Sequence, residues 1–265
     1  MWVMGEPEAK LVGGGGDGGG WGGGPLIGIT ADVEDLPRPS VVASRYKCAT
    51  TYAEAVVAAG GVPVLLCPRV ELVGAYVARL DGLIMTGGLD IDPGLLTEGP
   101  SAGVALHPAA TVMDARRQRF ELALLAAVDA RPELAVLGVC LGMQLMGVHA
   151  GARLVQHLDD ELATAEDHRD DREHGLVVGP AWGKSVLAGL NGLALVASNH
   201  HQAVDGHETQ GRLRELARSA DGVVEAVDDP ARRFYVGVQW HPERTRQPEL
   251  GWRVIERLVV AARLG

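Results

Sequence analysis

The residues "ELAVLGVCLGMQLMGVHAG", at positions 133–151, decide how the rest of the chain is interpreted. Their first half is a short apolar run, which is typical of a buried strand. Their second half has the pattern of a helix and ends on a glycine. Cys140 stands where the strand ends and the helix begins. It is therefore either a small residue of the core or a nucleophile that a sharp turn holds out of it.

The glycines around Cys140 fit the turn known as a nucleophile elbow. Gly138 and Gly142 lie two residues before and two residues after the cysteine. The turn brings strand and helix close together and strains the backbone of the nucleophile, so both positions need small residues. A helix N-terminus also favours the thiolate over the thiol. A free cysteine is nevertheless more often structural, and GxCxG arises by chance, so this stretch leaves both interpretations open.

A base and an orienting group for the thiolate stand near the end of a later strand, in "GVQWHPE" at positions 237–243. Residues two apart in an extended chain project to the same side. Glu243 can therefore accept a hydrogen bond from one ring nitrogen of His241 while the other nitrogen faces the sulfur. An isolated HPE is more simply a strand end with a solvated glutamate. The chain order of Cys140, His241 and Glu243, with the first at an elbow, favours a catalytic triad.

Attack on an amide also requires donors for the negative oxygen that forms. One donor would be the backbone N–H of Leu141, directly after the cysteine. The second comes from "TGGLDIDP" at positions 86–93, where Gly87 and Gly88 follow a strand and let backbone amides approach a ligand. We therefore expect an oxyanion hole built from Gly88 and Leu141. An ordinary glycine turn explains the second stretch equally well when it is taken alone.

The pattern around these motifs predicts an α/β fold. Short apolar runs alternate with longer helical patterns, which indicates a mostly parallel central sheet with helices on both faces. Beyond residue 151 the elements become several short strands before a closing helix, so we expect a smaller antiparallel β element in the C-terminal half. The predicted strands are 26–30, 62–66, 82–86, 133–139, 193–198, 222–227 and 234–240, and the predicted helices are 45–61, 71–80, 114–130, 141–151 and 248–263.

The first 24 residues differ from the rest of the chain. Positions 13–24, "GGGGDGGGWGGG", hold ten glycines and cannot bury enough surface to offset their chain entropy. The stretch has no strand before it, no helix after it and no GK[ST] ending, so it does not predict a phosphate-binding loop. We expect a flexible arm over residues 1–24 and a single domain over residues 25–265.

Composition narrows the class of protein. The chain has 265 residues, is 47% hydrophobic and carries a formal charge of −10 without a long basic cluster, so neither nucleic acid nor a membrane surface is expected as a partner. Its three cysteines are far apart, which argues against a disulfide framework and predicts that Cys48 and Cys67 are small core residues. With no apolar stretch long enough to span a bilayer and no signal peptide, the expected location is cytoplasmic.

Taken together, the motifs resemble those of the class I glutamine amidotransferases. More narrowly, the chain resembles the γ-glutamyl hydrolase branch that includes γ-glutamyl-γ-aminobutyrate hydrolase, over about residues 25–263. The resemblance implies a flavodoxin-like fold for a glutamine amidotransferase-like hydrolase domain. It is carried by "YAEAVVAAGGVPVLLCP" (52–68), "TGGLDIDP" (86–93), "GVCLGMQ" (138–144), "HR" at 168 with His174 six residues later, "SNHHQAV" (198–204), "ADGVVEAV" (220–227) and "GVQWHPE" (237–243).

The resemblance implies a role for each matching residue. Cys140 would be the nucleophile, His241 the general base and acid, and Glu243 its orienting partner. One histidine of the pair at 200 and 201 would line the active site while the other packs. No cofactor is implied. The substrate-binding residues implied by the matching motifs are Gly87, Gln144, Ser198, His200, His201 and Gln202.

Some positions depart from the pattern of the hydrolase branch. Leu141 follows the nucleophile where the branch often has arginine, and it gives the GxCLGMQ form usual in glutaminase subunits. Gln118 stands where aspartate is usual in the helix that also carries Arg117 and Glu121. Ala197 and Asn199 replace an asparagine and an aromatic residue beside the HHQ motif. These departures bear on which amine leaves.

Three functions remain open at this level. The first is a cysteine-dependent hydrolase that cleaves a small-molecule γ-glutamyl amide through a thioester, as in polyamine catabolism. The second is a glutaminase subunit that supplies ammonia to a separate synthase, and the third is a non-catalytic binding protein of the same fold. A homodimer is left open. Because no HxxxH or HxH pattern stands with a carboxylate among the nine histidines, no metal is expected.

Overall fold

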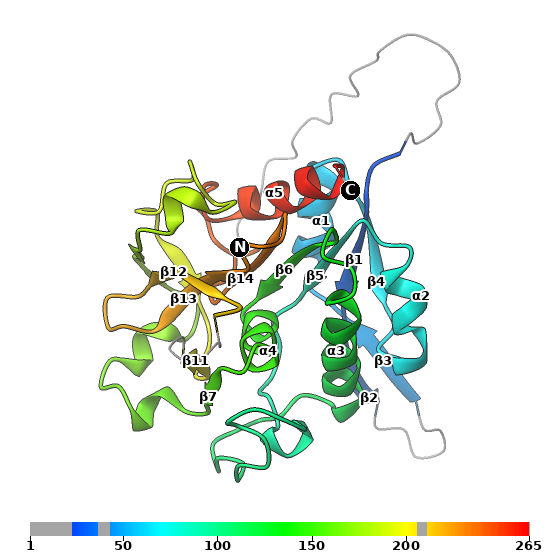
Figure 1. The fold of residues 1–265 in the computed structure, drawn as a ribbon. Coiled ribbons are helices and arrows are strands. Elements are labelled where there is room, and N and C mark those ends of the chain that lie inside the picture. The colour runs from blue at the N-terminus through cyan, green and yellow to red at the C-terminus, as the bar shows by residue number, and fades with distance from the viewer. Residues whose placement is uncertain (1–22, 37–42, 206–210, 265) are drawn as a thin grey trace.

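A computed structural model describes residues 23–36, 43–205 and 211–264 (Figure 1). Except for its last two residues, the arm predicted over residues 1–24 lies outside them. Within the described part of the chain, no helix combines the length and the apolar character needed to cross a membrane.

An eight-stranded sheet runs through the molecule in the order β4-β1-β5-β6-β14-β13-β12-β9. The first five strands in this order are parallel, and the last three continue the sheet in antiparallel pairing. The predicted sheet, mostly parallel with antiparallel strands in the C-terminal half, is therefore confirmed. The strands are β1 (Leu26–Thr30), β4 (Val62–Leu66), β5 (Gly82–Met85), β6 (Ala135–Val139), β9 (Val177–Val178), β12 (Arg214–Arg218), β13 (Val224–Asp228) and β14 (Tyr235–Val238).

Helices cover both faces of the sheet, because neighbouring residues of each central strand point in opposite directions. Ile84 and Leu137 lie in the core that α1 and α5 cover. Their neighbours Leu83 and Val136 lie in the core that α2, α3 and α4 cover. Figure 1 shows α1 and α5 together at one side of the sheet and α3 and α4 at the other. The helices are α1 (Thr50–Ala58), α2 (Val73–Val77), α3 (Ala115–Val128), α4 (Leu141–His149) and α5 (Trp252–Ala262).

The first predicted helix begins later than expected. Residues 45–47, predicted to be helical, belong to β3 (Ala43–Lys47), which forms a hairpin with β2 (Asp32–Leu36). The register places Arg45 opposite Glu34, and the guanidinium donates to that carboxylate at 2.6 Å. Cross-strand pairs of opposite charge stabilise such a ribbon, and this pairing overrides the helical pattern at residues 45–47.

Short antiparallel pairs complete the C-terminal half of the chain. They form two-stranded sheets separate from the main sheet. They are β8 (Arg172–His174) with β10 (Val196–Ser198), and β7 (Arg153–Val155) with β11 (Ala203–Asp205).

Three adjacent parallel strands meet at the edge of the sheet where their carboxyl ends lie. β5 ends before Gly87, β6 ends before Cys140, and β14 ends before His241. Since β6 pairs with both β5 and β14, residues far apart in the sequence emerge side by side. The carboxyl edge of a parallel sheet is where α/β proteins place ligands, and the predicted site residues converge there.

Candidate active site

Cys140 occupies the sharp turn that the glycine spacing predicts. Its backbone has φ 50° and ψ −104°, in a region that side chains rarely adopt, and it immediately precedes α4. Its N–H donates to the carbonyl of Val238 on β14 at 2.8 Å. A Cβ added at Gly138 would overlap the sulfur of Met146, and one at Gly142 would overlap the carbonyl oxygen of Met85. Both glycines are needed for strand and helix to pack this closely.

The predicted base and its partner form a short, buried hydrogen bond. His241 Nδ1 and Glu243 Oε1 are 2.7 Å apart, and both side chains are almost fully removed from solvent. The backbone N–H of His241 donates to the carbonyl of Ala197 at 2.9 Å, which fixes the start of the turn. The sequence-based prediction that these two residues face the same side agrees with this geometry.

Gly87 lies directly between the histidine and the cysteine. A Cβ built on Gly87 would lie 2.8 Å from Cε1 of His241 and 3.6 Å from Cβ of Cys140. The imidazole and Cys140 therefore lie near the same backbone position, and glycine there leaves room for the imidazole. Beside it, a Cβ on Gly88 would lie 2.8 Å from Leu141 Cδ2. The two predicted oxyanion donors, the N–H groups of Gly88 and Leu141, belong to neighbouring residues in space.

The electrostatics of the pair favour a charged imidazole. Burial alone would lower the pKa of His241, but the negative charges of Cys140 and Glu243 raise it to about 10. A thiolate and an imidazolium side by side are the activated form of a cysteine nucleophile.

Arg117 holds the loop after β5 in place. Its side chain is buried on α3, and its guanidinium donates to the carbonyls of Thr86 and Gly87 at 3.0 and 3.1 Å. Glu121, one turn further along the helix, accepts from its Nε at 3.0 Å. On the other side, the N–H of Gly87 donates to the hydroxyl of Tyr52 at 3.2 Å. Sequence reasoning did not assign a function to Tyr52, and it noted Arg117 and Glu121 only as matches to a family pattern.

Gln118 holds the far end of the same loop through two hydrogen bonds to Asp92. Its Oε1 accepts from the backbone N–H of Asp92 at 2.9 Å, and its Nε2 donates to the backbone carbonyl at 2.8 Å. An amide can do both, whereas the aspartate usual at this position only accepts when it is ionised. The departure from the family pattern therefore gives the loop an additional hydrogen bond.

Replacing Gln118 with methionine should loosen this loop. The change keeps the volume and leaves the backbone N–H and carbonyl of Asp92 without their partner, which costs about 1–3 kcal/mol of unfolding free energy. Urea unfolding would measure the loss. Arg119→Met, at the exposed neighbouring position on α3, is the matched control and should change stability by less than about 0.5 kcal/mol. Equal stability of the two variants would contradict the proposed role of Gln118.

The segment after β10 forms another wall of the site, in addition to the loop after β5. Gln202 Oε1 accepts from the N–H of Ile91 at 3.0 Å, and the carbonyl of Gln202 accepts from Gln144 Nε2 at 2.8 Å. His201 Nε2 lies 2.9 Å from Asp90 Oδ2. This segment is thus joined to the loop after β5 and to α4, and the cleft is enclosed between them.

Two cavities, of about 470 and 320 Å³, form the cleft and share Gly88, Leu89 and Asn199 in their lining. His241 and Glu243 line the larger cavity, and Cys140 lines the smaller one. Among the predicted substrate-binding residues, Gly87 borders the larger cavity, and Gln144, His200, His201 and Gln202 border the smaller one.

Two expectations about individual residues need correction, and a third holds in part. Ser198 is fully buried and lines neither cavity, and its hydroxyl donates to the carbonyl of His168 at 3.4 Å. Both His200 and His201 border the smaller cavity, although one was expected only to pack. Cys48 precedes α1 and is only partly buried: it packs against the core, as predicted, but it also lines the larger cavity. Burial raises the pKa of the Cys48 thiol to about 11.

Comparisons with known proteins find a family model and several relatives similar to this chain. Residues 25–243 match the model of the peptidase C26 family. A Mycobacterium tuberculosis relative named "Putative glutamine amidotransferase Rv2859c" is 36% identical over 228 residues, covering 83% of this chain and 70% of the relative. Gamma-glutamyl-gamma-aminobutyrate hydrolase PuuD of Escherichia coli strain K12 is 31% identical over 205 residues, covering 72% and 76%.

A solved structure has the same fold. The glutaminase domain of Trypanosoma brucei CTPS with bound acivicin has a TM-score of 0.56 at 16% identity, and the match covers 90% of this chain and 93% of that one. At this level of identity the similarity establishes the fold alone.

Proposed function

Since this chain belongs to the peptidase C26 family of class I glutamine amidotransferase-like hydrolases, we propose that it hydrolyses γ-glutamyl amides to glutamate and an amine. The observation that carries the proposal is the strained turn at Cys140 with the hydrogen-bonded pair of His241 and Glu243 beside it. A nucleophile, a base and an orienting carboxylate in this order form the working parts of a cysteine hydrolase.

In the proposed first step, the Cys140 thiolate attacks the γ-carbonyl carbon, and a C–S bond forms. The N–H groups of Gly88 and Leu141 stabilise the oxyanion of the tetrahedral intermediate. The imidazolium of His241 gives its proton to the nitrogen as the C–N bond breaks, and the amine leaves. A γ-glutamyl thioester remains on the cysteine.

In the proposed second step, water replaces the sulfur. The thiolate charge that raises the pKa of His241 is absent from the thioester, so that pKa falls and the neutral imidazole can accept a proton from water. The hydroxide forms a C–O bond, the C–S bond breaks, and glutamate leaves. The imidazolium and the thiolate are restored together, and no cofactor takes part.

The pKa of His241 provides a test of this coupling. A neighbouring anion favours the charged imidazole and raises the pKa of His241 from its ordinary value near 6.5 to about 10. We therefore expect the ring in the wild-type protein to remain protonated over the pH range between these two values. In Cys140→Ser, the neutral hydroxyl withdraws this support and burial lowers the pKa. Titration of the ring protons by NMR would measure the change, with His241→Asn to assign the signals. An equal pKa in both proteins would rule out a thiolate beside His241.

The larger cavity supports a substituted amine as the leaving group. Ammonia is about the size of a water molecule, which occupies roughly 30 Å³ in the liquid, whereas this cavity has about 470 Å³. Charged side chains of both signs line it, among them Asp32, Lys47 and Arg244. Such a lining suits a polar amine that carries a charge of its own, and γ-aminobutyrate is one such amine.

A glutaminase subunit remains the second candidate function. Leu141 gives the nucleophile motif the form usual in subunits that pass ammonia to a synthase. This function would require a partner protein and would favour free glutamine as the substrate.

The decisive experiment is a screen of γ-glutamyl amides with mass detection of the released amine. The panel should contain γ-glutamyl-γ-aminobutyrate, a γ-glutamyl diamine, a γ-glutamyl alkylamine and glutamine. We expect release from substituted amides by the purified chain without a partner. Release from glutamine only, and only with an added synthase, would support the second function, and no release from any compound would refute the hydrolase.

A further inference from the structure

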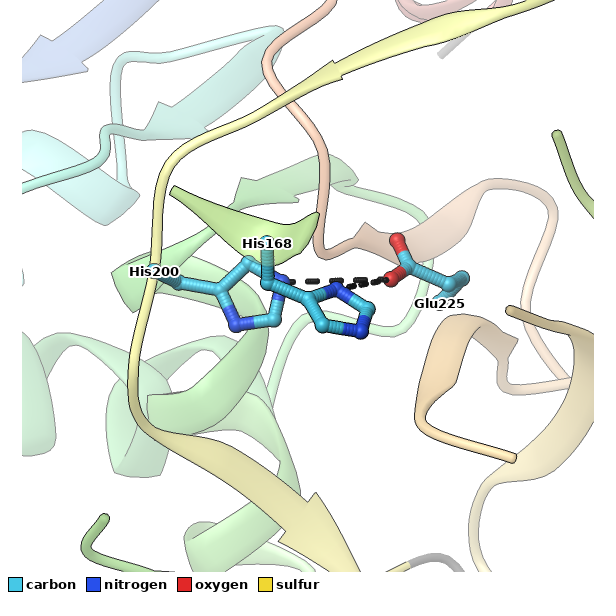
Figure 2. Close-up of side chains that lie close together, drawn as sticks. All are labelled: His168, His200 and Glu225. Atoms are coloured by element: carbon cyan, nitrogen blue, oxygen red, sulfur yellow. Dashed lines mark ion pairs between the residues drawn. The ribbon is translucent and has the colours of Figure 1, made fainter. Parts of the chain in front are cut away.

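A second cluster of polar side chains lies within the molecule, apart from the thiol and its base. It consists of His168, His174, His200 and Glu225, which we call the histidine cluster. Figure 2 shows His168 and His200 with one ring nitrogen each directed at the carboxylate of Glu225. Glu225 Oε1 lies 3.5 Å from His168 Nδ1, 3.5 Å from His174 Nε2 and 3.8 Å from His200 Nε2.

The atoms that face the centre of the cluster have no hydrogen-bond partner among the described residues. They are Nδ1 of His168, Nε2 of His174, Nε2 of His200 and both carboxylate oxygens of Glu225. Glu225 is fully buried, His168 and His200 are nearly so, and His174 is mostly buried. Buried polar atoms are almost always paired, so a set of unpaired atoms around one point indicates something that they share.

The outer nitrogen of each ring does have an acceptor. His168 Nε2 lies 3.1 Å from Asp221 Oδ2, His200 Nδ1 lies 2.9 Å from the carbonyl of Gln202, and His174 Nδ1 lies 3.1 Å from the carbonyl of Gly175. An acceptor at the outer nitrogen requires the proton there. In each neutral ring, the inner nitrogen therefore presents a lone pair to the centre of the cluster.

Protons alone are a poor explanation for this arrangement. A proton on one ring, such as that of His168, would pair that ring with Glu225 and leave the inner nitrogens of the other two rings without a partner, whereas charging all three rings would place three cations beside one buried carboxylate. The distances of 3.5 to 3.8 Å are also longer than the roughly 2.7–2.9 Å of a charge-assisted hydrogen bond. A cation between His168, His200 and Glu225 would give the inner atoms of all three a shared partner.

We propose that His168, His200 and Glu225 bind a divalent transition-metal ion, with His174 drawn in from beside them as a further ligand, and that zinc fits the site best. The ligand atoms of His168, His200 and Glu225 all lie within 4.8 Å of one another, which is close enough for a small shift to bring them around one ion. Acceptors on the outer nitrogens, one of them the carboxylate of Asp221, are the usual supports of metal-bound histidine. Two imidazoles and one carboxylate are the kinds of ligand that zinc takes, and His174 stands beside them as a candidate fourth.

The ion would join three segments that are far apart in the chain. His168 ends the short helix Ala165–His168, His174 ends β8, His200 follows β10, and Glu225 belongs to β13 of the main sheet. His200 also borders the smaller cavity of the cleft. A bound ion would thus fix the wall of the cleft to the sheet while taking no part in the reaction itself. The sequence did not predict this site, because the metal motifs considered have ligands a few residues apart. The ligands proposed here are spread over residues 168–225.

Metal analysis of the purified full-length chain tests the proposal without any substrate. After growth with zinc, mass spectrometry of the metal content should find about one equivalent per chain. Glu225→Gln and His200→Asn should lose most of it. His149→Asn is the matched control, since His149 pairs with Asp129 outside the cluster, and it should retain the full equivalent.

A second measurement on the wild-type chain does not depend on how the variants fold. After removal of the metal with dipicolinate, added Co²⁺ should give the visible absorption of a tetrahedral ion, and added Zn²⁺ should raise the unfolding temperature. The proposal is overturned if the wild-type chain holds no transition metal and gives neither the spectrum nor the shift. It is also overturned if Glu225→Gln retains as much metal as His149→Asn. These results do not depend on whether γ-glutamyl amides are substrates.

Discussion

Replacing Cys140 with serine is expected to lower the kcat for glutamate release by about 10⁴–10⁶-fold, because the proposed mechanism has no other nucleophile. A hydroxyl is a far weaker nucleophile at neutral pH than a thiolate supported by an imidazolium. Steady-state assays on the best γ-glutamyl amide would measure the loss. Glu243→Gln should reduce turnover less, because the carboxylate only orients and stabilises His241.

The other cysteines provide an internal control for this prediction. A glutamine-mimicking alkylator should label Cys140 in the wild-type chain and leave Cys48 unlabelled, since burial raises the pKa of the Cys48 thiol to about 11. The Cys140→Ser protein should then carry no label. Turnover that survives in Cys140→Ser, or labelling that is unaffected by the change, would exclude Cys140 as the nucleophile.

Replacing Gly142 with alanine should be the most damaging single-methyl change near the site. The new Cβ would overlap the carbonyl oxygen of Met85 and lie 2.8 Å from its carbonyl carbon, and both atoms belong to a central strand that cannot easily move. Overpacking of this kind costs about 1–3 kcal/mol, and a clash with backbone places this one at or above the upper end. Thermal unfolding would measure the loss of stability. A lower rate of Cys140 alkylation would show that the turn no longer holds the thiol in its reactive position.

Gly74→Ala is the matched control for this change. Gly74 lies in α2, and a Cβ there would meet no atom within 4 Å. Alanine is favoured over glycine inside a helix by about 0.5–1 kcal/mol, so this variant should be slightly more stable than the wild type. Similar unfolding temperatures for Gly142→Ala and Gly74→Ala would contradict the packing argument.

The sequence predicted the parts of the fold that local pattern controls. The apolar run before Cys140 and the glycines around it led to a strand, a sharp turn and a helix, and the structure has β6, the strained turn and α4 at these positions. The spacing of His241 and Glu243 predicted that the two side chains meet, and their atoms lie 2.7 Å apart. In each case the residues that carry the signal lie within a few positions of one another in the sequence.

The sequence could not predict features that depend on strand order. The positions of Arg117 and Gln118 beside the loop after β5 follow from how α3 packs on the sheet, and their own neighbours in the sequence carry no sign of it. The same holds for the histidine cluster, whose members come from three segments that are far apart in the chain. The hairpin of β2 and β3 was missed because its charged residues at 45 and 47 fit a helical pattern as well as a ribbon.

The pairing of β6 with β14 has a consequence for biosynthesis. The sulfur emerges from the ribosome about a hundred residues before its imidazole, because the two are carried by strands that are neighbours in space but distant in translation. Until the later strand arrives, the nascent chain presents an unpaired edge at β6 that invites association with other chains. Docking of the C-terminal strands closes that edge and at the same time brings the imidazole to the thiol. The nascent chain therefore cannot acquire its reactive pair before the sheet is complete.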